Sequence, residues 1–383
     1  MRLSLKSLLP DLPRLREDPL GFLQALAQRG DRFVLPRPPV AFLFDPEGVE
    51  KALLEAKTSK KTFQYRGLSR VTGKGLLTDD GEGWKKARLA LKDPFLPRAM
   101  PALRPLLEEE AEAFFSGWRP GKRELEREML ALSLRFLGRA YFGGPLPEEV
   151  AEVSLRALTQ VIAAAKTPWL LLSPAHRAAL ARERKRLLGQ AASLLARFPP
   201  LKALPEERAL AEAVTLLIAG HETTASALSW SLYLLMKHPV HIPRLLEREE
   251  YALWTFQEAL RLYPPAWVIT RRLEAPLALA GLRLPPGTLL VLSPFATHRT
   301  RFQDPLAFWP ERFRKTPRPG AYFPFGLGQR TCLGKDFALL EGVVALRALF
   351  ARYRLELLEE PGLEAGVTLR PKGGLWAVVR EAG

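Results

Sequence analysis

The segment from Phe325 to Gly334 holds the residues whose types and spacing most clearly suggest chemistry. It contains Cys332, the only cysteine among 383 residues, set among three glycines. Glycines let a backbone turn tightly and approach a flat ligand closely. A cysteine just before a helix start meets free backbone N–H groups and the positive end of the helix dipole, and both favour its thiolate form. We therefore expect a thiolate ligand for one soft, open metal site, of which haem iron is the known case.

Other interpretations of this segment fail on spacing. A phosphate-binding loop requires Ser or Thr after its Gly-Lys pair, but Lys335 is followed by Asp336. A dinucleotide-binding fingerprint needs a third glycine where Thr331 lies. One cysteine cannot form a zinc pair, an iron–sulfur cluster, a disulfide or a Cys-x-x-Cys-His attachment for covalent haem. A buried, inert cysteine remains as the alternative.

The pattern Phe-x-x-Gly-x-Arg-x-Cys-x-Gly resembles the haem-binding signature of the cytochrome P450 family. The resemblance implies that Cys332 is the axial ligand of haem b. It also implies that the cofactor is surrounded by Phe325, Gly326, Arg330 and Gly334.

A long helical pattern, 205–237, would lie on the opposite side of such a cofactor. It spans roughly 50 Å at ~1.5 Å per residue. Its apolar middle raises a transmembrane interpretation. His221 and Glu222 at its centre argue against this interpretation, because ionisable groups are costly in mid-membrane.

The run from Ala219 to Thr224 within this helix is similar to the family's oxygen-binding helix. Gly220 costs helix stability, and we expect a close-packed ligand to offset that cost. The similarity implies that Ala219 and Gly220 contact the cofactor and that Glu222 and Thr223 deliver protons during O–O cleavage. The alternative is a polar defect in a core helix.

Four further residues match positions where the family binds haem propionates. Trp84 and Arg88 share one helix face at i and i+4, although an isolated pair of this kind can be a surface cation–π contact. Arg271 matches a second propionate contact, and His298 is a weaker candidate.

Glu258 and Arg261 lie on one helix face, and Arg312 follows downstream in the sequence Pro-Glu-Arg-Phe. Exposed ion pairs of this spacing are common and carry little information. The apolar setting and the family resemblance imply a buried network of these three residues below the haem.

Residues 58–83 look like a loop, in which Gln64, Tyr65, Leu76 and Leu77 are candidate substrate contacts. Trp267 and Val268 are two more, since the chain of the family passes over the haem there. The stretches 62–77 and 258–274 are closely similar to the carotenoid-hydroxylating branch of the family, from thermophilic bacteria. This similarity implies hydroxylation of the β-carotene ring.

We expect one mainly helical domain over residues 1–383, with a small β region and the haem between the long helix and the cysteine loop. Between residues 166 and 204 only one long helix is predicted, from about 175 to 197. The predicted strands are 32–35, 40–44, 277–279, 282–284 and 289–292, with a C-terminal hairpin of 367–370 and 376–380.

The amino-acid composition indicates which kinds of binding partner and which cellular compartment suit the protein. A net charge of +16 and a pI of about 10.1 favour anionic partners, yet no RNA-binding signature appears. One cysteine is consistent with a reducing cytoplasm. The N-terminus has neither signal peptide nor anchor pattern, so we expect a soluble, cytoplasmic monomer. The lack of asparagine and the 34 prolines fit a heat-adapted source.

The motifs and the family resemblance together imply a haem monooxygenase that inserts one oxygen atom into a C–H bond. No flavin or nicotinamide motif occurs, so we expect electrons from an acidic ferredoxin-type donor with its NAD(P)H reductase. This donor would dock near Lys85, Lys86 and Lys335. The alternatives are a fatty-acid hydroxylase or peroxygenase, a haem-thiolate isomerase, a non-catalytic haem sensor, and a cysteine hydrolase using His221 or His298.

Overall fold

The computed structural model describes residues 12–167, 170, 172–279 and 281–382. Its helices are α2 (Leu12–Glu17), α3 (Pro19–Arg29), α4 (Pro46–Glu50), α5 (Phe63–Thr72), α6 (Gly81–Leu91), α7 (Met100–Ser116), α8 (Leu125–Tyr141), α9 (Glu149–Lys166), α10 (Pro174–Ala192), α11 (Glu206–Lys237), α12 (Ile242–Glu247), α13 (Glu249–Leu262), α14 (Pro294–His298) and α15 (Lys335–Arg352). Its strands are β1 (Arg32–Pro36), β2 (Pro39–Leu43), β3 (Thr58–Ser59), β4 (Gly121–Glu124), β5 (Ile269–Leu273), β6 (Leu277–Leu279), β7 (Leu282–Leu284), β8 (Leu289–Leu292), β9 (Tyr353–Leu357), β10 (Gly362–Ala365), β11 (Leu369–Lys372) and β12 (Trp376–Glu381).

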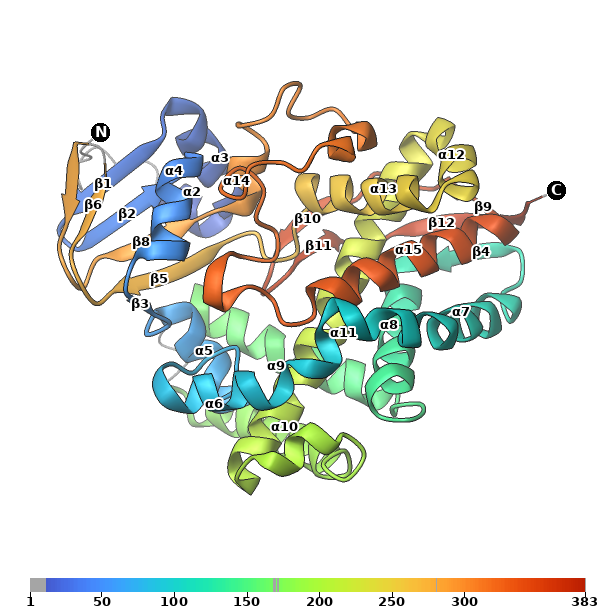
Figure 1. Ribbon diagram of the computed structural model, residues 1–383, viewed down its shortest axis with the longest axis horizontal. Coiled ribbons are helices and arrows are strands. Elements are labelled where there is room, and N and C mark those ends of the chain that lie inside the picture. The colour runs from blue at the N-terminus through green and yellow to red at the C-terminus, as the bar shows by residue number, and fades with distance from the viewer. Residues whose placement is uncertain (1–11, 168–169, 171, 280, 383) are drawn as a thin grey trace.

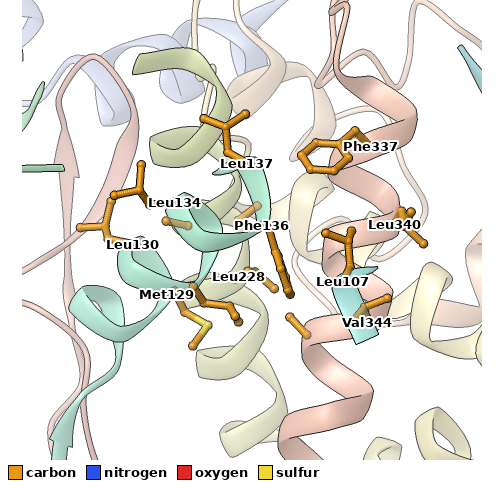
Figure 2. Close-up of a cluster of buried hydrophobic side chains, with 14 of the residues drawn as sticks. Leu107, Met129, Leu130, Leu134, Phe136, Leu137, Leu228, Phe337, Leu340 and Val344 are labelled. Carbon is orange, nitrogen blue, oxygen red and sulfur yellow. The ribbon is translucent and has the colours of Figure 1, made fainter. Parts of the chain in front are cut away.

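The predicted long helix is confirmed as α11, 32 residues that run through the middle of the helical part (Figure 1). Glu206 and Glu207 in its first turn and Lys237 in its last complement the helix dipole. Helices α8 and α15 pack against it. Leu228 of α11, Phe136 of α8 and other buried apolar side chains form the core between them (Figure 2). Within the described residues no helix is long and apolar enough to span a membrane.

The largest sheet places the N-terminal strands beside a segment more than 200 residues later. Its strand order is β1-β2-β8-β5-β3, and it lies at one side of the molecule (Figure 1). Strand β2 runs parallel to β8, while the other pairs are antiparallel. The predicted strands 32–35, 40–44 and 289–292 are thus confirmed within a residue or two. The sheet fixes Arg271 on β5 opposite Leu290.

The predicted C-terminal hairpin is wrong in its pairing. Both strands exist, but β11 pairs with β10, whereas β12 pairs with β9 and β4. Gly373 and Gly374 have φ of 85° and 83°, a left-handed conformation that favours glycine. These two residues lead the chain out of one sheet and into another instead of closing a hairpin.

The predicted loop 58–83 contains a helix, α5. Tyr65, Leu68 and Val71 recur every third residue, are buried, and face the core. Gly67 within the helix and the surrounding Thr and Ser residues concealed this periodicity. The prediction of one long helix in 166–204 is confirmed by α10, which ends five residues earlier than expected.

Candidate active site

The cysteine loop is a tight reversal that ends at α15. The backbone N–H of Cys332 donates to the Phe325 carbonyl at 2.8 Å. Gly326 and Gly328 both have φ of 68°. A Cβ on Gly328 would also lie 2.7 Å from the Leu53 carbonyl oxygen, so this position requires glycine for conformation and for space.

The expected thiolate character of Cys332 is not a property of the protein alone. Desolvation raises the pKa of the Cys332 thiol, and it outweighs the Gly334 N–H and the Arg88 and Lys60 cations, which act in the opposite direction. The helix start is therefore too weak to produce a thiolate by itself. The side chain is nevertheless exposed. The sulfur is thus accessible yet lies in desolvating surroundings, and a metal cation bound to it would favour the thiolate.

Four basic residues form a cluster beside Cys332: Lys60 and Arg88 act electrostatically on the sulfur, and Arg271 and Arg330 act on Lys60. They come from the segment before α5 (Lys60), from α6 (Arg88), from β5 (Arg271) and from the cysteine loop (Arg330). Desolvation, reinforced by the three arginines, lowers the pKa of Lys60 far below its usual value. Desolvation also lowers the pKa of Arg330 to about 10. Sequence reasoning missed Lys60, because a lysine next to Lys61 in a polar stretch gives no signal of burial.

The cluster has less negative charge than positive charge. Among the described residues, Asp80 is the one carboxylate that forms an ion pair with any of the four, at 2.5 Å from Arg330. Arg88 is half-buried and has no hydrogen-bond or ion-pair partner in the described part of the chain. Burying unpaired cations is costly, so this group fits an anionic ligand. The two propionates of a haem ligated by Cys332 would supply the missing charge.

Two sequence-predicted propionate contacts, Trp84 and His298, have partners within the protein. The Arg330 guanidinium lies over the Trp84 ring, 3.7 Å from its centroid, so the cation on this ring is not the Arg88 of the alternative interpretation. The Nδ1 of His298 pairs with the Arg261 carbonyl at 3.1 Å, and its Nε2 accepts from the Phe323 N–H at 3.1 Å. Both ring nitrogens are thus engaged, and desolvation lowers the pKa of His298 to about 3. The structure therefore removes His298 from the proposed propionate contacts.

On α11, the side chains of Glu222 and Thr223 form hydrogen bonds with different partners. The Thr223 hydroxyl donates to the Ala219 carbonyl at 2.8 Å. Glu222 is buried and accepts a hydrogen bond from the Thr368 hydroxyl at 2.9 Å. Burial raises the pKa of Glu222 to about 7. Thr368, just before β11, is a site residue that sequence reasoning missed, because only the fold brings it beside α11.

Gly220 has a different explanation from the one expected. A Cβ there would lie 2.8 Å from a methyl carbon of Leu137 on α8. The glycine therefore permits close packing of α8 on α11, whatever else it contacts. His221 bonds through Nδ1 to the Leu217 carbonyl, and desolvation lowers its pKa to about 4, so it remains neutral in the core.

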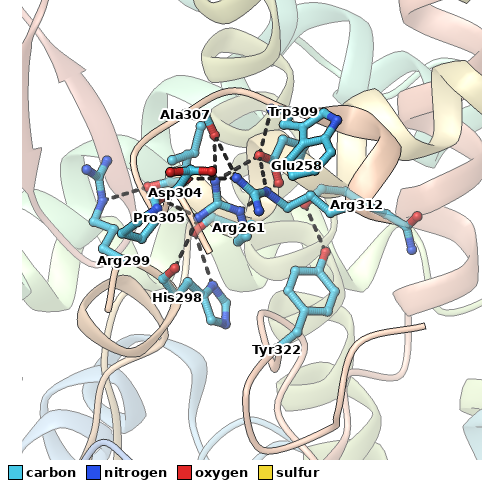
Figure 3. Close-up of polar contacts among 12 residues, drawn as sticks. Glu258, Arg261, His298, Arg299, Asp304, Pro305, Ala307, Trp309, Arg312 and Tyr322 are labelled. Carbon is cyan, nitrogen blue, oxygen red and sulfur yellow. Dashed lines mark hydrogen bonds and ion pairs between the residues drawn. The ribbon is translucent and has the colours of Figure 1, made fainter. Parts of the chain in front are cut away.

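Glu258, Arg261 and Arg312 form one buried network, as Figure 3 shows. Glu258 and Arg261 form two hydrogen bonds, at 2.6 and 2.8 Å, and both side chains are fully buried. Arg312 Nε donates to the same carboxylate at 3.1 Å. The arginines also donate to the carbonyls of His298, Pro305, Ala307, Gln303 and Asp304. The network thus ties α13 to the irregular segment that leads to the cysteine loop.

The predicted substrate contacts fall into two groups. Gln64 and Tyr65 on α5 bind β5 directly, through the Thr270 hydroxyl at 2.9 Å and the Arg271 guanidinium at 3.0 Å. Trp267 donates to the Gly366 carbonyl at 2.9 Å. The partly buried apolar group consists of Leu76, Leu77 and Val268.

The fold and the cysteine loop agree with what comparison with known proteins shows. A cytochrome P450 family profile matches residues 174–376, and the chain belongs to the cytochrome P450 family. CYP175A1 from one strain of Thermus thermophilus is 58% identical, with a TM-score of 0.95 over 99% of this chain and 100% of that one. A 6-coordinated cytochrome P450 from another strain of Thermus thermophilus is 57% identical, with a TM-score of 0.90 over 95% of this chain and 99% of that one. Cyclooctatin synthase of Streptomyces melanosporofaciens is 30% identical over 92% of this chain and 88% of its own length.

The predicted fold class is therefore confirmed as the mainly helical P450 fold with small β-sheets. The protein is a cytochrome P450 monooxygenase. Membership of the family implies a haem cofactor, a redox partner and a small-molecule substrate.

Proposed function

We propose that this protein hydroxylates an apolar polyene, with the β-carotene ring as the site of attack. One observation supports this most strongly. The two segments whose sequences resemble the carotenoid-hydroxylating branch, 62–77 and 258–274, lie against each other. Thr62 and Thr270 share a hydrogen bond at 2.8 Å, and Tyr65 binds Arg271 at 3.0 Å. Because both segments resemble the same branch of the family and pack against each other, we infer that they form a common binding surface. We call the segments 62–77 and 258–274 the proposed substrate wall.

Haem b is the proposed cofactor, and the cation cluster supports its placement beside Cys332. When bound, it supplies the chemistry of dioxygen activation. Cys332 would ligate the iron, while Arg88, Arg271 and Arg330 would bind the propionates, a role that suits arginine. Packing around the cofactor is assigned to Trp84, Ala219, Gly220, Phe325, Gly326 and Gly334.

Proton supply is assigned to α11. With its pKa raised to about 7, the Glu222 carboxyl holds a proton under mildly acidic to neutral conditions. The Thr368 hydroxyl orients that carboxyl, and the Thr223 hydroxyl is the second hydrogen-bonding group of the helix. A positioned donor limits the loss of reductant as hydrogen peroxide.

The electron donor is proposed to be an acidic, ferredoxin-type protein with an NAD(P)H reductase. The net charge of +16 would attract it. Lys86 and Lys335 are exposed near the cysteine face, while Lys85 is paired with Glu82 at 2.6 Å. We assign the chain to a single domain acting as a monomer, and the lone cysteine supports a cytoplasmic location.

A turnover screen tests this function against the alternatives. The haem-loaded protein, with a ferredoxin and its reductase, would be given β-carotene or dodecanoate. Ring-hydroxylated carotene as the main product supports the proposal. Exclusive oxidation of dodecanoate would make the protein a fatty-acid hydroxylase. Product formed with hydrogen peroxide alone, and none with reductant, would identify a peroxygenase. Loss of all turnover despite intact haem would favour a sensor.

A further inference from the structure

A pocket lies between α5 and α10. Its volume is about 490 Å³, within the range of small-ligand sites. Its lining consists of Arg70 on α5 and of His176, Arg177, Leu180, Ala181, Arg184, Lys185 and Leu188 on α10. None of these residues belongs to the proposed haem site or is one of the proposed substrate contacts Gln64, Tyr65, Leu76, Leu77, Trp267 and Val268, so the active site does not explain this pocket.

The charge around this pocket is of one sign. Arg70, Arg177, Arg184 and Lys185 have no ion-pair partner in the described part of the chain, and no acidic residue is among the lining residues. Glu183, the one acid of α10, is buried against other arginines, Arg156 and Arg186. On α10, Glu183 is therefore not among the residues that line the pocket, whereas Arg177, Arg184 and Lys185 line it.

Two further features indicate what kind of anion fits. Leu180, Ala181 and Leu188 supply an apolar surface, with Leu188 about two helical turns after the adjacent pair Leu180 and Ala181 on α10. His176 is buried at the pocket, and its Nε2 has no hydrogen-bond partner among the described residues. A bare inorganic ion would leave the apolar surface uncovered, whereas a chain of methylenes would cover it.

From this combination we infer a binding site for a single-chain amphiphilic anion, a carboxylate or phosphate headgroup on an apolar chain. The four cations hold the headgroup, and the leucines contact the first methylenes. Helix α5 also carries Tyr65, which binds Arg271. A ligand held between α5 and α10 would therefore stabilise the position of a helix that belongs to the proposed substrate wall. The inference concerns binding and stands independently of which substrate is oxidised.

The test measures calorimetric binding of decanoate monomer to the haem-loaded protein, while the Soret band reports any entry into the haem site. The variant is Arg177→Gln/Arg184→Gln. The control, Arg182→Gln/Arg127→Gln, removes two exposed arginines outside the pocket. We expect binding without a Soret change, about tenfold weaker in the pocket variant, because two partly exposed charge contacts are together worth about one decade. The control should bind as the wild type does, and decan-1-ol should bind far more weakly.

Three results would overturn the inference. Equal binding by the pocket variant would remove the cations from the site. Equal binding of decan-1-ol would make the pocket merely apolar. Association with phosphatidylglycerol vesicles but not with monomeric decanoate would identify a membrane-contact surface instead of a ligand site. Similar melting temperatures of all variants would show that none of these outcomes reflects misfolding.

Discussion

The Thr368 hydroxyl donates a hydrogen bond to the Glu222 carboxylate at 2.9 Å, and so links the start of β11 to the middle of α11. Glu222 is 4% exposed and Thr368 is 3% exposed. Nearby Arg370, which is ion-paired with Glu126, favours the charged form of Glu222, yet burial still raises the Glu222 pKa to about 7. The orientation and the pKa of the Glu222 carboxyl, which we assign to proton supply, therefore depend in part on Thr368, a residue outside the acid–alcohol pair of α11.

The first prediction concerns the pH dependence of coupling, the ratio of hydroxylated product to NAD(P)H consumed. The raised pKa means that Glu222 carries its proton below about pH 7 and loses it above. Coupling should therefore fall as pH rises through about 7. Replacing Thr368 by Val removes a contact that favours the charged form, so the midpoint should move to higher pH. Glu222→Gln should have low coupling and no midpoint in this range. An unchanged midpoint in Thr368→Val would separate Thr368 from proton supply.

The second prediction separates Thr223 from Thr368. Thr223→Ala should retain haem and accept electrons, but more reductant should appear as hydrogen peroxide and less as product. The reason is that the hydroxyl on the helix is lost while the Glu222–Thr368 pair remains. Product and peroxide would be measured together in the reconstituted ferredoxin system. Thr215→Ala, which removes a similar back-bonded hydroxyl two turns earlier, serves as the control. Wild-type coupling in Thr223→Ala would leave that hydroxyl with a structural role only.

The third prediction concerns the buried network of Glu258, Arg261 and Arg312. Glu258→Ala should lower the free energy of unfolding by about 3–5 kcal/mol, because it leaves Arg261 as an uncompensated buried charge. Glu356→Ala, which breaks an exposed pair with Arg380, should cost less than about 1 kcal/mol. Chemical denaturation of the haem-loaded proteins measures both. A similar small cost for the two variants would mean that the buried pair contributes no more than a surface pair.

The fourth prediction tests the cation cluster. Arg88→Gln should accelerate haem loss by about ten- to a hundredfold, since a desolvated, charged hydrogen bond is worth about 1.5–3 kcal/mol and each ~1.4 kcal/mol is a factor of ten. Lys86→Gln, an exposed charge on the same helix, should not change the rate. Haem transfer to an excess of apomyoglobin gives the rate directly. If both variants released haem at the wild-type rate, Arg88 would not contact a propionate.

Local patterns predicted the long helix and the cysteine loop, because each is decided by residues close in sequence, whereas the buried Glu258–Arg261 pair was predicted from its apolar setting and the family resemblance. What local patterns could not predict depends on distant segments. The pairing of β12 with β9 and β4, the partner of Glu222 and the burial of Lys60 all arise from residues brought together by the fold. The pKa of Cys332 also differed from expectation, because desolvation by the surrounding fold outweighs the helix start.

The most direct test of the account is the carbon monoxide spectrum of the reduced, haem-loaded protein. If Cys332 ligates the iron, the wild type should show the red-shifted Soret band of thiolate-bound haem. Cys332→Ser should lose that band and the monooxygenase activity, while haem remains held by the cation cluster. A Cys332→Ser protein that kept both the shifted band and hydroxylation would contradict the assignment of Cys332 as the axial ligand.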